Sequence, residues 1–288
     1  MFLPRRILEE KLLKMLAEDM GQGDITTPLI VPENCDVEAK VIAKESGIAA
    51  GIEEAKILLE SLGLRVKTLV SDGKKIKSKQ ALMEIVGEAR TMLSVERTLL
   101  NLLSRMSGIA TATRRLVEKV QKAGLKTRVA CTRKTAPGLL YFDKKAVSVG
   151  GGDTHRLHLD DMILIKDNHI AVAGSVEAAI RKVRERVSFS KKVEVEVTKG
   201  DDVLVAAKSG VDIIMLDNFS PKQIEKAVKS LRDVGFFGKV LLEASGGITT
   251  ENIMGFASTG VNLVSLGEIT DSAKSLDISM EITKINKM

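Results

Sequence analysis

The segment VEVEVTKGDDVLVAAKSGVDIIMLD, residues 193–217, decides the fold of most of this chain. It contains an apolar strand at 193–197, an amphipathic helix at 202–208 and a second apolar strand at 211–216. Two such strands separated by one helix predict a parallel pair with a right-handed crossover. The same alternation continues on both sides. Further strands are predicted at 128–131, 162–165, 240–242 and 263–266, with helices at 176–187, 221–232 and 251–258.

The six strands predict a parallel sheet covered on both faces, because nearly every strand residue is apolar. Six such units are fewer than the eight of a closed barrel, so we predict an α/β fold with an incomplete, open parallel barrel over residues 109–288. Residues 1–108 mix strands and helices and predict an N-terminal α+β sandwich domain, whose last helix is expected to end at Gly108. The C-terminal segment, about residues 270–288, is expected to pack back on this domain.

The composition is that of an ordinary globular protein. The 288 residues include 44 Lys and Arg against 38 Asp and Glu, and 44% are hydrophobic, which excludes disordered, collagen-like and coiled-coil chains. No apolar run approaches the roughly 20 residues of a membrane span. Cys35 and Cys131 are too few for a disulfide framework, so we expect reduced thiols and a cytoplasmic location. Aromatic residues are only 3%, which disfavours nucleic-acid binding by base stacking.

Polar or glycine residues follow all six predicted strands, at the edge where parallel α/β folds bind ligands. They are Arg133, Lys134, Lys166, Glu196, Asp217, Glu243, Ser245 and Gly267. One such residue would mean little, because strand ends are exposed in any case. A complete set, with cations on the early strands and carboxylates in the middle, predicts a binding site for an anionic ligand.

Two glycine-containing loops accompany these strand ends. The glycines at 150–152 are expected to let the backbone approach a ligand. The loop SGGITT, residues 245–250, leads into a helix whose first-turn amides would form a phosphate cup, with Gly267 contributing at the next strand end.

Two sets of residues in the sequence are candidate metal ligands. His155 and His158, followed by two aspartates, are disfavoured because no third ligand is spaced to complete the set. Glu196 and Asp217 are the better candidates for Mg²⁺ or for a pair of ribose hydroxyls, since hard cations prefer oxygen ligands.

Several of these residues belong to an ordered series of motifs. In the second half they are TRKT (132–135), GGGxxHR (150–156), LIKDNH (164–169), EVEV (194–197), LDN (216–218) and EASGG (243–247). Upstream, DITT (24–27) and ERTLLNL (96–102) complete the series. Taken together, it resembles the quinolinate phosphoribosyltransferases, also called nicotinate-nucleotide pyrophosphorylases (carboxylating), over nearly the whole chain.

The resemblance implies transfer of phosphoribose from phosphoribosyl pyrophosphate to quinolinate. The products would be nicotinate mononucleotide, pyrophosphate and CO2, in de novo NAD biosynthesis. It also implies Mg²⁺ with phosphoribosyl pyrophosphate, no tightly bound organic cofactor, and a homodimer with shared active sites. Neither a nucleic acid nor a membrane is implied as a partner.

The motif match also implies residue roles. The residues that would bind the quinolinate carboxylates are Arg133, His155, Arg156 and Lys166, with Arg97 contributed from the partner subunit. Lys134 would lie near the pyrophosphate and the reacting ring, with Lys144 assisting. Glu196 and Asp217 would hold the ribose and its Mg²⁺, and together with Lys134 they form the implied catalytic set. The 5′-phosphate would be bound by Ser245, Gly246 and Gly267.

Two departures from the family pattern leave alternatives open. Leu140 stands where many members carry a basic residue, and Thr154 stands where Asn often precedes His-Arg. A related group associated with molybdate transport keeps much of the pattern, so a different substrate is one alternative. A Schiff-base lyase with Lys166 or Lys134 as the amine nucleophile is another, and a nucleic-acid-binding protein is a third.

Overall fold

The computed structural model of the protein describes residues 3–286, which form two compact units. The first unit contains the described residues up to Arg114, then Tyr141–Gly151, then those from Ala273 onward. The second contains Arg115–Leu140 and Gly152–Ser272. The domain boundary predicted at residue 108 therefore lies inside the first unit, and the first unit takes in a later stretch of the chain as well.

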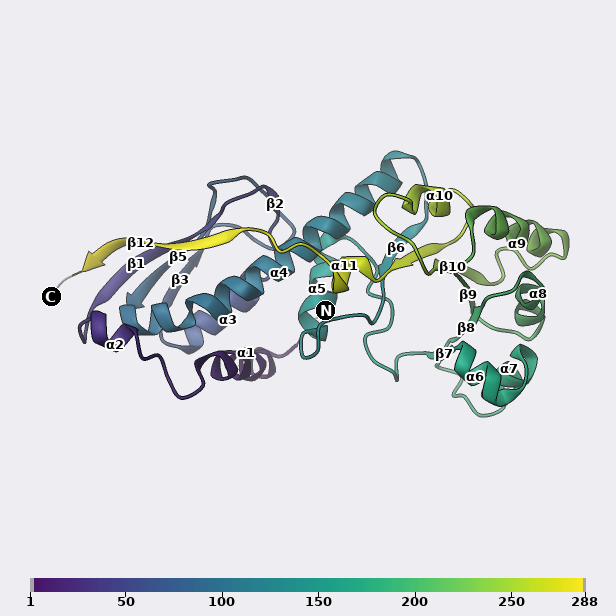
Figure 1. The fold of residues 1–288 in the computed structure, drawn as a ribbon, viewed down its shortest axis with the longest axis horizontal. Helices are drawn as coiled ribbons and strands as arrows, with labels where there is room; N and C mark the ends of the chain where they lie inside the picture. Colours follow the sequence, from purple (N-terminus) through teal and green to yellow (C-terminus); the bar gives the residue numbers. More distant parts are fainter. Residues whose placement is uncertain (1–2, 287–288) are drawn as a thin grey trace. The chain divides into compact units, whose positions relative to one another are not determined.

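The first unit is built on a four-stranded antiparallel sheet in the order β12-β1-β5-β3. Its strands are β1 (Asp36–Ala43), β3 (Arg65–Thr68), β5 (Ala81–Glu88) and β12 (Ile278–Asn286). Strand β1 alternates in burial along its length, with Val37, Ala39 and Val41 facing the core. Figure 1 shows β12, from the end of the described chain, lying beside β1, from near its start.

The other elements of this unit are α1 (Arg5–Met20), α2 (Thr27–Ile30), β2 (Gly47–Ile48), α3 (Ile52–Ser61), β4 (Lys75–Ile76), α5 (Leu140–Gly150) and most of α4 (Ala89–Lys122). Helix α3 packs on β3, and α1 packs on α3. The buried residues of α1 are Leu8, Leu12 and Leu16, one per turn, and Gly21 is the C-cap of the helix.

The prediction that a helix ends at Gly108 is wrong. Helix α4 continues through this glycine to Lys122. A methyl group at Gly108 would lie 2.2 Å from the carbonyl oxygen of Lys274, so glycine is needed there for close packing against a later segment. The cost of a glycine within a helix is about 1 kcal/mol, which the surrounding packing can outweigh.

The glycine at position 150 also serves packing. It is the last residue of α5, and a methyl group there would lie 2.7 Å from the carbonyl oxygen of Ala110 on α4. Two helices can approach this closely only where a side chain is missing. The sequence analysis expected this glycine to bring the backbone close to a ligand. In the structure it instead allows a close contact between α5 and α4 within the first unit.

Buried charges fix α5 to its neighbours. Asp143 is fully buried and accepts two hydrogen bonds from the guanidinium of Arg105, at 2.7 and 2.8 Å. Lys145 donates to Glu53 at 2.6 Å and to the fully buried Glu54 at 2.7 Å. Burial raises the pKa of Glu54, against the effect of the lysine.

The DITT motif forms a turn held by its aspartate. The carboxylate of Asp24 accepts hydrogen bonds from the backbone N–H groups of Thr26 and Thr27, at 2.9 and 3.0 Å, and from the hydroxyl of Ser94 at 3.1 Å. It also accepts the hydroxyl of Thr27. The bonds from Thr27 are the main cause that lowers the pKa of Asp24 to about 2. The motif therefore has a structural function in the first unit.

The second unit contains a six-stranded parallel sheet in the order β6-β11-β10-β9-β8-β7. The strands are β6 (Arg128–Cys131), β7 (Ile163–Ile165), β8 (Val193–Val197), β9 (Ile213–Asp217), β10 (Leu241–Ser245) and β11 (Leu263–Leu266). Strands β6 and β7 stand at the two ends of this order, so the predicted open α/β barrel is confirmed. The sequence placed the ends of β9 and β10 one and three residues too early.

Helices connect these strands along one side of the sheet, as Figure 1 shows for α7, α8 and α9. The helices are α6 (Asp167–Ala173), α7 (Val176–Arg184), α8 (Gly200–Lys208), α9 (Pro221–Asp233), α10 (Ile253–Ala257) and α11 (Glu268–Asp271). Helix α9 begins at a capping box, in which Ser220 accepts from the N–H of Gln223. Within residues 3–286, no helix is both long and apolar enough to cross a bilayer.

Candidate active site

A cleft of about 800 Å³ opens at the carboxyl ends of the parallel strands of the second unit. Eleven of the residues that the sequence singles out line it: Arg133, Lys134, His155, Arg156, Lys166, Glu196, Asp217, Glu243, Ser245, Gly246 and Gly267. The cations and the carboxylates therefore face one space, which is the geometry that the sequence argument needs.

The first two cations lie in a tight loop after β6. Its backbone is held by hydrogen bonds from the N–H of Lys134 to the hydroxyl of Thr132 and from the N–H of Thr135 to the carbonyl of Arg133, at 3.1 and 3.0 Å. The carbonyl of Lys134 accepts from the hydroxyl of Thr270 on α11, at 2.7 Å. Because both cationic side chains are exposed at the cleft, they can reach an anion without reorganising the loop.

A second pair of cations is Arg156, between α5 and β7, and Lys166, directly after β7. Arg156 is 7% exposed, and burial and the charge of Arg133 lower its pKa. Its Nε is a buried donor that has no hydrogen-bond partner among residues 3–286. Lys166 is the N-cap residue of α6, and its Nζ lies 3.4 Å from Oε1 of Glu196. Its backbone N–H donates to Nδ1 of His169, so His169 has a structural function.

The carboxylates of Glu196 and Asp217 come from the neighbouring strands β8 and β9. Burial raises the pKa of Glu196, and the charge of Asp217 acts in the same direction. Two carboxylates on adjacent strands, both open to one cleft, form a donor set that fits Mg²⁺, which keeps several waters and takes one or two carboxylates together with substrate phosphates.

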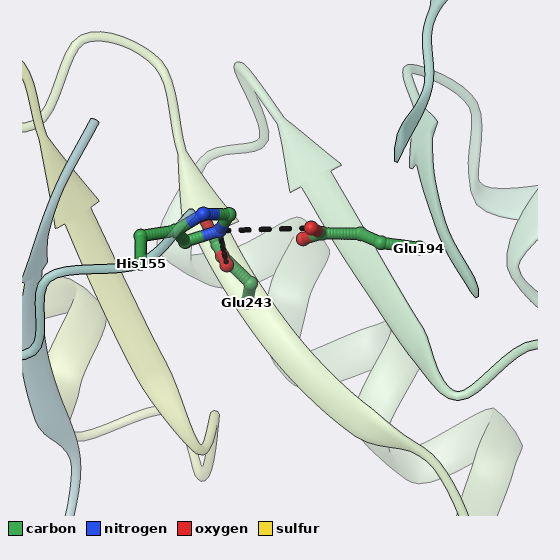
Figure 2. A group of neighbouring side chains, drawn as sticks. All are labelled: His155, Glu194 and Glu243. Atoms are coloured by element: carbon green, nitrogen blue, oxygen red, sulfur yellow. Dashed lines mark hydrogen bonds and ion pairs between the residues drawn. The ribbon is translucent and has the colours of Figure 1, made fainter. Parts of the chain in front are cut away.

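At the wall of the cleft, His155 lies between two buried glutamates (Figure 2). Its Nε2 is 3.0 Å from Glu243 of β10 and 3.6 Å from Glu194 of β8. Its Nδ1 accepts the backbone N–H of Arg156 at 2.8 Å, which places the ring proton on Nε2. The negative charges of the two glutamates favour a second proton on the imidazole. A proton on Nδ1 would, however, break the hydrogen bond that Nδ1 accepts from the N–H of Arg156. Burial opposes a charged ring, but the hydrogen bonds and charges of the two glutamates outweigh it and raise the pKa of His155 to about 10. Burial raises the pKa of Glu194 to about 7, so one extra proton is held within this group of three side chains.

These three side chains are a group in the described residues with a geometry that a metal ion could use, since their ligand atoms lie within 4.8 Å of one another. His158 is not part of it. Its backbone N–H, with that of Leu157, donates to Asp161 in an exposed loop. The two histidines are therefore not brought together, and the spacing of the sequence gave no sign that His155 would meet two glutamates.

The loop after β10 differs in detail from the predicted phosphate cup. Helix α10 begins only at Ile253, and the N–H groups of Thr249 and Thr250 already donate to Asn252 and Glu268, at 2.8 and 3.1 Å. The free first-turn amides that the sequence predicted are therefore occupied at these two positions. The cleft side of the loop is formed by Ser245, the two following glycines, and Ile248.

Gly246 is required by its surroundings. Its φ is +84°, and a methyl group there would lie 2.4 Å from Oδ1 and 2.8 Å from the backbone nitrogen of Asn218. Asn218 also has a positive φ, of 57°. The two loops after β9 and β10 thus pack backbone to backbone beneath the cleft, which only glycine permits.

Four residues that the sequence associated with the site do not line this cleft. Arg97 lies exposed on α4, and Lys144 is fully buried on α5, both in the first unit. Leu140 and Thr154, the departures from the family pattern, also stand outside the lining. The concern that these two substitutions reshape the pocket finds no direct contact to support it.

Other residues of the cleft were missed. Glu268 and Asp271 of α11 line it without having been singled out, and Asn218 was quoted only as part of the LDN motif, with no role. The residue pattern of α11 does not indicate a site, because the helix is a single turn of four residues. It reaches the cleft only through its packing against Lys134. For Glu194, the available signal was a carboxylate inside a strand whose other residues, apart from Glu196, are valines.

Comparisons with known proteins agree over the whole chain. Residues 24–107 match the family model described as "Quinolinate phosphoribosyl transferase, N-terminal domain", and residues 109–281 match the corresponding C-terminal domain. A probable nicotinate-nucleotide pyrophosphorylase [carboxylating] from Methanothermobacter thermautotrophicus is 45% identical over 269 residues, covering 93% of this chain and 96% of the relative. The rat enzyme of that name is 37% identical, covering 88% and 84%.

Solved structures show the same likeness. The nicotinate-nucleotide pyrophosphorylase from Francisella tularensis superposes with a TM-score of 0.89 at 38% identity, covering 98% of each chain. NadC from Streptococcus pyogenes superposes with a TM-score of 0.91 at 37% identity, covering 100% of each chain.

Proposed function

This chain belongs to the quinolinate phosphoribosyltransferase family, and we propose how its cleft performs the family's reaction. The protein is a pentosyltransferase of NAD biosynthesis. It converts quinolinate and phosphoribosyl pyrophosphate into nicotinate mononucleotide, pyrophosphate and CO2. The observation that carries the residue roles below is that cations and carboxylates from five different strand ends face one cleft.

Quinolinate is bound by the cations at one side of the cleft. Its two carboxylates match Arg133 and Lys166, which follow β6 and β7, and Arg156, which lies between α5 and β7 with His155 beside it. The unpartnered Nε of Arg156 supports this role, because a buried guanidinium nitrogen without a partner is stabilised by an incoming carboxylate.

The ribose and the pyrophosphate occupy the rest of the cleft. As the bond from C1 to the pyrophosphate oxygen lengthens, the ribose gains positive charge and the leaving group gains negative charge. Glu196 and Asp217 stabilise the former, and Lys134 the latter. Ser245, Gly246 and Gly267 contact the 5′-phosphate.

Mg²⁺ is proposed as the metal of this reaction, held by the two carboxylates and by the substrate. When bound, it neutralises charge on the pyrophosphate. The residues of the protein do the rest: they place the pyridine nitrogen against C1 and exclude competing water. The positive pyridinium formed by the transfer then makes loss of CO2 easier, and no nucleophile of the protein is consumed.

A second copy of the chain is proposed to complete the site. Arg97 is exposed on α4 and does not line the cleft of its own chain's second unit. The family pattern places an arginine of the partner subunit at the quinolinate carboxylates, and the exposed guanidinium is free to take that role. We also propose a cytoplasmic location, for which the two free cysteines are the supporting observation.

The test is a turnover assay with purified protein, Mg²⁺, phosphoribosyl pyrophosphate and quinolinate, following nicotinate mononucleotide and CO2. Lys134→Ala and Arg156→Ala are each expected to lower the rate by about 100-fold or more, if each stabilises developing or substrate charge. Turnover with nicotinate but not with quinolinate would refute the substrate assignment. Rates unchanged by both substitutions would refute the roles assigned to this cleft.

A further inference from the structure

Glu243 is a buried residue in the lining of the cleft to which the proposed reaction assigns no role. It lies on β10, is 0% exposed, and both of its carboxylate oxygens have partners. Oε2 faces Nε2 of His155 at 3.0 Å, and Oε1 accepts from the hydroxyl of Ser265 at 2.5 Å. A carboxylate buried this completely costs free energy unless its contacts offset the loss of water. One contact leads through His155 to Arg156 and the other through Ser265 to Ser245, and both of these end residues line the cleft.

The contact through the imidazole leads to the dicarboxylate end. His155 has a φ of +51°, a left-handed conformation that costs free energy for a residue with a side chain. The ring is fixed on both sides, because Nε2 faces Glu243 and Nδ1 accepts the N–H of Arg156. Holding the ring therefore holds the peptide that carries Arg156, and with it the direction in which that guanidinium enters the cleft.

The contact through Ser265 leads to the phosphate end. Ser265 lies on β11, is 2% exposed, and its hydroxyl is 2.9 Å from the hydroxyl of Ser245. Ser245 is the last residue of β10 and lines the cleft. With Ser265 fixed by the carboxylate, the hydroxyl of Ser245 is held at the start of the glycine loop.

We propose that Glu243 is a positioning residue for both substrates: through His155 it aims Arg156 at the pyridine dicarboxylate, and through Ser265 it places Ser245 at the sugar phosphate. The inference rests on the proposed function for the identity of the two ligands. It makes Glu243 responsible for the relative placement of the two subsites, although its carboxylate is out of reach of solvent.

The surroundings favour a direct carboxylate contact. Glu194 is the other acid that faces the imidazole, with Oε2 at 3.6 Å from Nε2 of His155. Its neighbours on the adjacent strands β7 and β9 are the apolar residues Leu164 and Ile213. The hydrogen bond to Ser265 occupies the second oxygen of Glu243, so that oxygen is directed away from the ring. A metal ion held by His155 and the two glutamates is the competing explanation, and the test below separates the two.

The test compares three variants of the full-length protein. Glu243→Met removes both acceptors at similar volume, and Ser265→Ala removes only the branch toward the phosphate. Glu54→Met is the matched control, because Glu54 is also a 0% exposed glutamate with a cationic partner but lies in the first unit. For each variant, kcat, both KM values and the melting temperature are measured, and the purified protein is analysed for bound metal.

Glu243→Met is expected to raise both KM values by about 10-fold, and Ser265→Ala to raise only that of phosphoribosyl pyrophosphate, by about 5-fold, as for one lost hydrogen bond. In both variants kcat should change by less than about 3-fold, since neither residue touches the reacting atoms. Glu54→Met should lower the melting temperature and leave both KM values unchanged. If Glu243→Met does not fold, Glu243→Gln, with one acceptor oxygen in place of two, is used, and at least one KM should rise.

Several results would overturn the proposal. They are KM values that stay at the wild-type level, a loss confined to kcat, and a lower melting temperature as the only effect. Stoichiometric metal in the wild type that is lost with Glu243→Met would replace it with a metal site. Failure of the proposed function is a separate outcome. If the wild type turns over nicotinate instead, the same KM comparison with that base still decides the role of Glu243.

Discussion

A single methyl group added at Gly246 tests whether the backbone contact beneath the cleft sets the geometry of the phosphate loop. In Gly246→Ala, the new methyl would lie 2.4 Å from Oδ1 of Asn218, while ordinary contact begins at 3.4 Å, so one of the two loops must move by about 1 Å. Rotating the asparagine side chain does not remove the conflict, because the backbone nitrogen of Asn218 is only 2.8 Å away.

The next residue provides the matched control. Gly247 also has a positive φ, of 62°, but a methyl group there would meet nothing within 4 Å. Gly247→Ala is therefore destabilised only by the left-handed backbone conformation, by about 1 kcal/mol. This lowers the melting temperature by roughly 2–4 °C in a protein of this size. Gly246→Ala is destabilised by the same backbone conformation and also by the steric conflict with Asn218. Together they lower the free energy of unfolding by about 3 kcal/mol and the melting temperature by roughly 6–12 °C.

The kinetic difference should be larger than the thermal one. A misplacement of about 1 Å at a substrate-positioning loop can cost about 100-fold in rate, so Gly246→Ala should lose about that much in kcat/KM for phosphoribosyl pyrophosphate. Gly247→Ala should lose only a few-fold. Thermal denaturation and initial rates are measured for both variants. Equal losses in the two, in either measurement, would refute the claim that the contact with Asn218 fixes this loop.

The remaining predictions concern the partner subunit, the buried charges of α5 and the DITT turn. Mixing inactive Arg97→Ala and Lys134→Ala proteins should restore part of the activity if sites are shared, and no recovery despite proven subunit exchange would count against sharing. Lys145→Met should lower the free energy of unfolding by about 3 kcal/mol in urea titrations, because it leaves Glu54 buried without its partner, while both KM values stay unchanged. The pKa of Asp24 is lowered from 3.8 to about 2, so its stabilising effect is present above pH 4 and is lost as the pH falls toward 2. Melting temperatures between pH 5 and pH 2.5 should fall less steeply for Asp24→Asn than for the wild type, and parallel curves would contradict this.

The strand ends illustrate how much of the candidate site could be predicted. Because parallel strands bring their carboxyl ends to one edge, reading the residues after each strand was enough to place Arg133, Lys166 and Asp217 in one cleft. The argument needed only the order of strands and helices, which short-range hydrophobic periodicity reveals.

The same local reasoning failed for glycines. It interpreted Gly108 as the end of a helix and the glycine at 150 as a point of ligand approach, and both are places where another segment packs too closely for a side chain. A missing side chain carries the same local signal in a turn, a helix contact or a phosphate loop. Only the distant segment that it meets, such as Lys274 against Gly108, distinguishes these cases.

By itself, the sequence determined the parallel strands of the second unit, the side of the sheet that binds ligands, and the kinds of charge gathered there. These follow from the period of apolar residues and from the chemistry of single side chains. The tertiary structure alone decided that Glu243 meets both His155 and Ser265, since residues 88 and 22 positions apart came together only when β10 took its place in the sheet. Contacts of that kind depend on the register between strands, and register is set by packing across the whole unit.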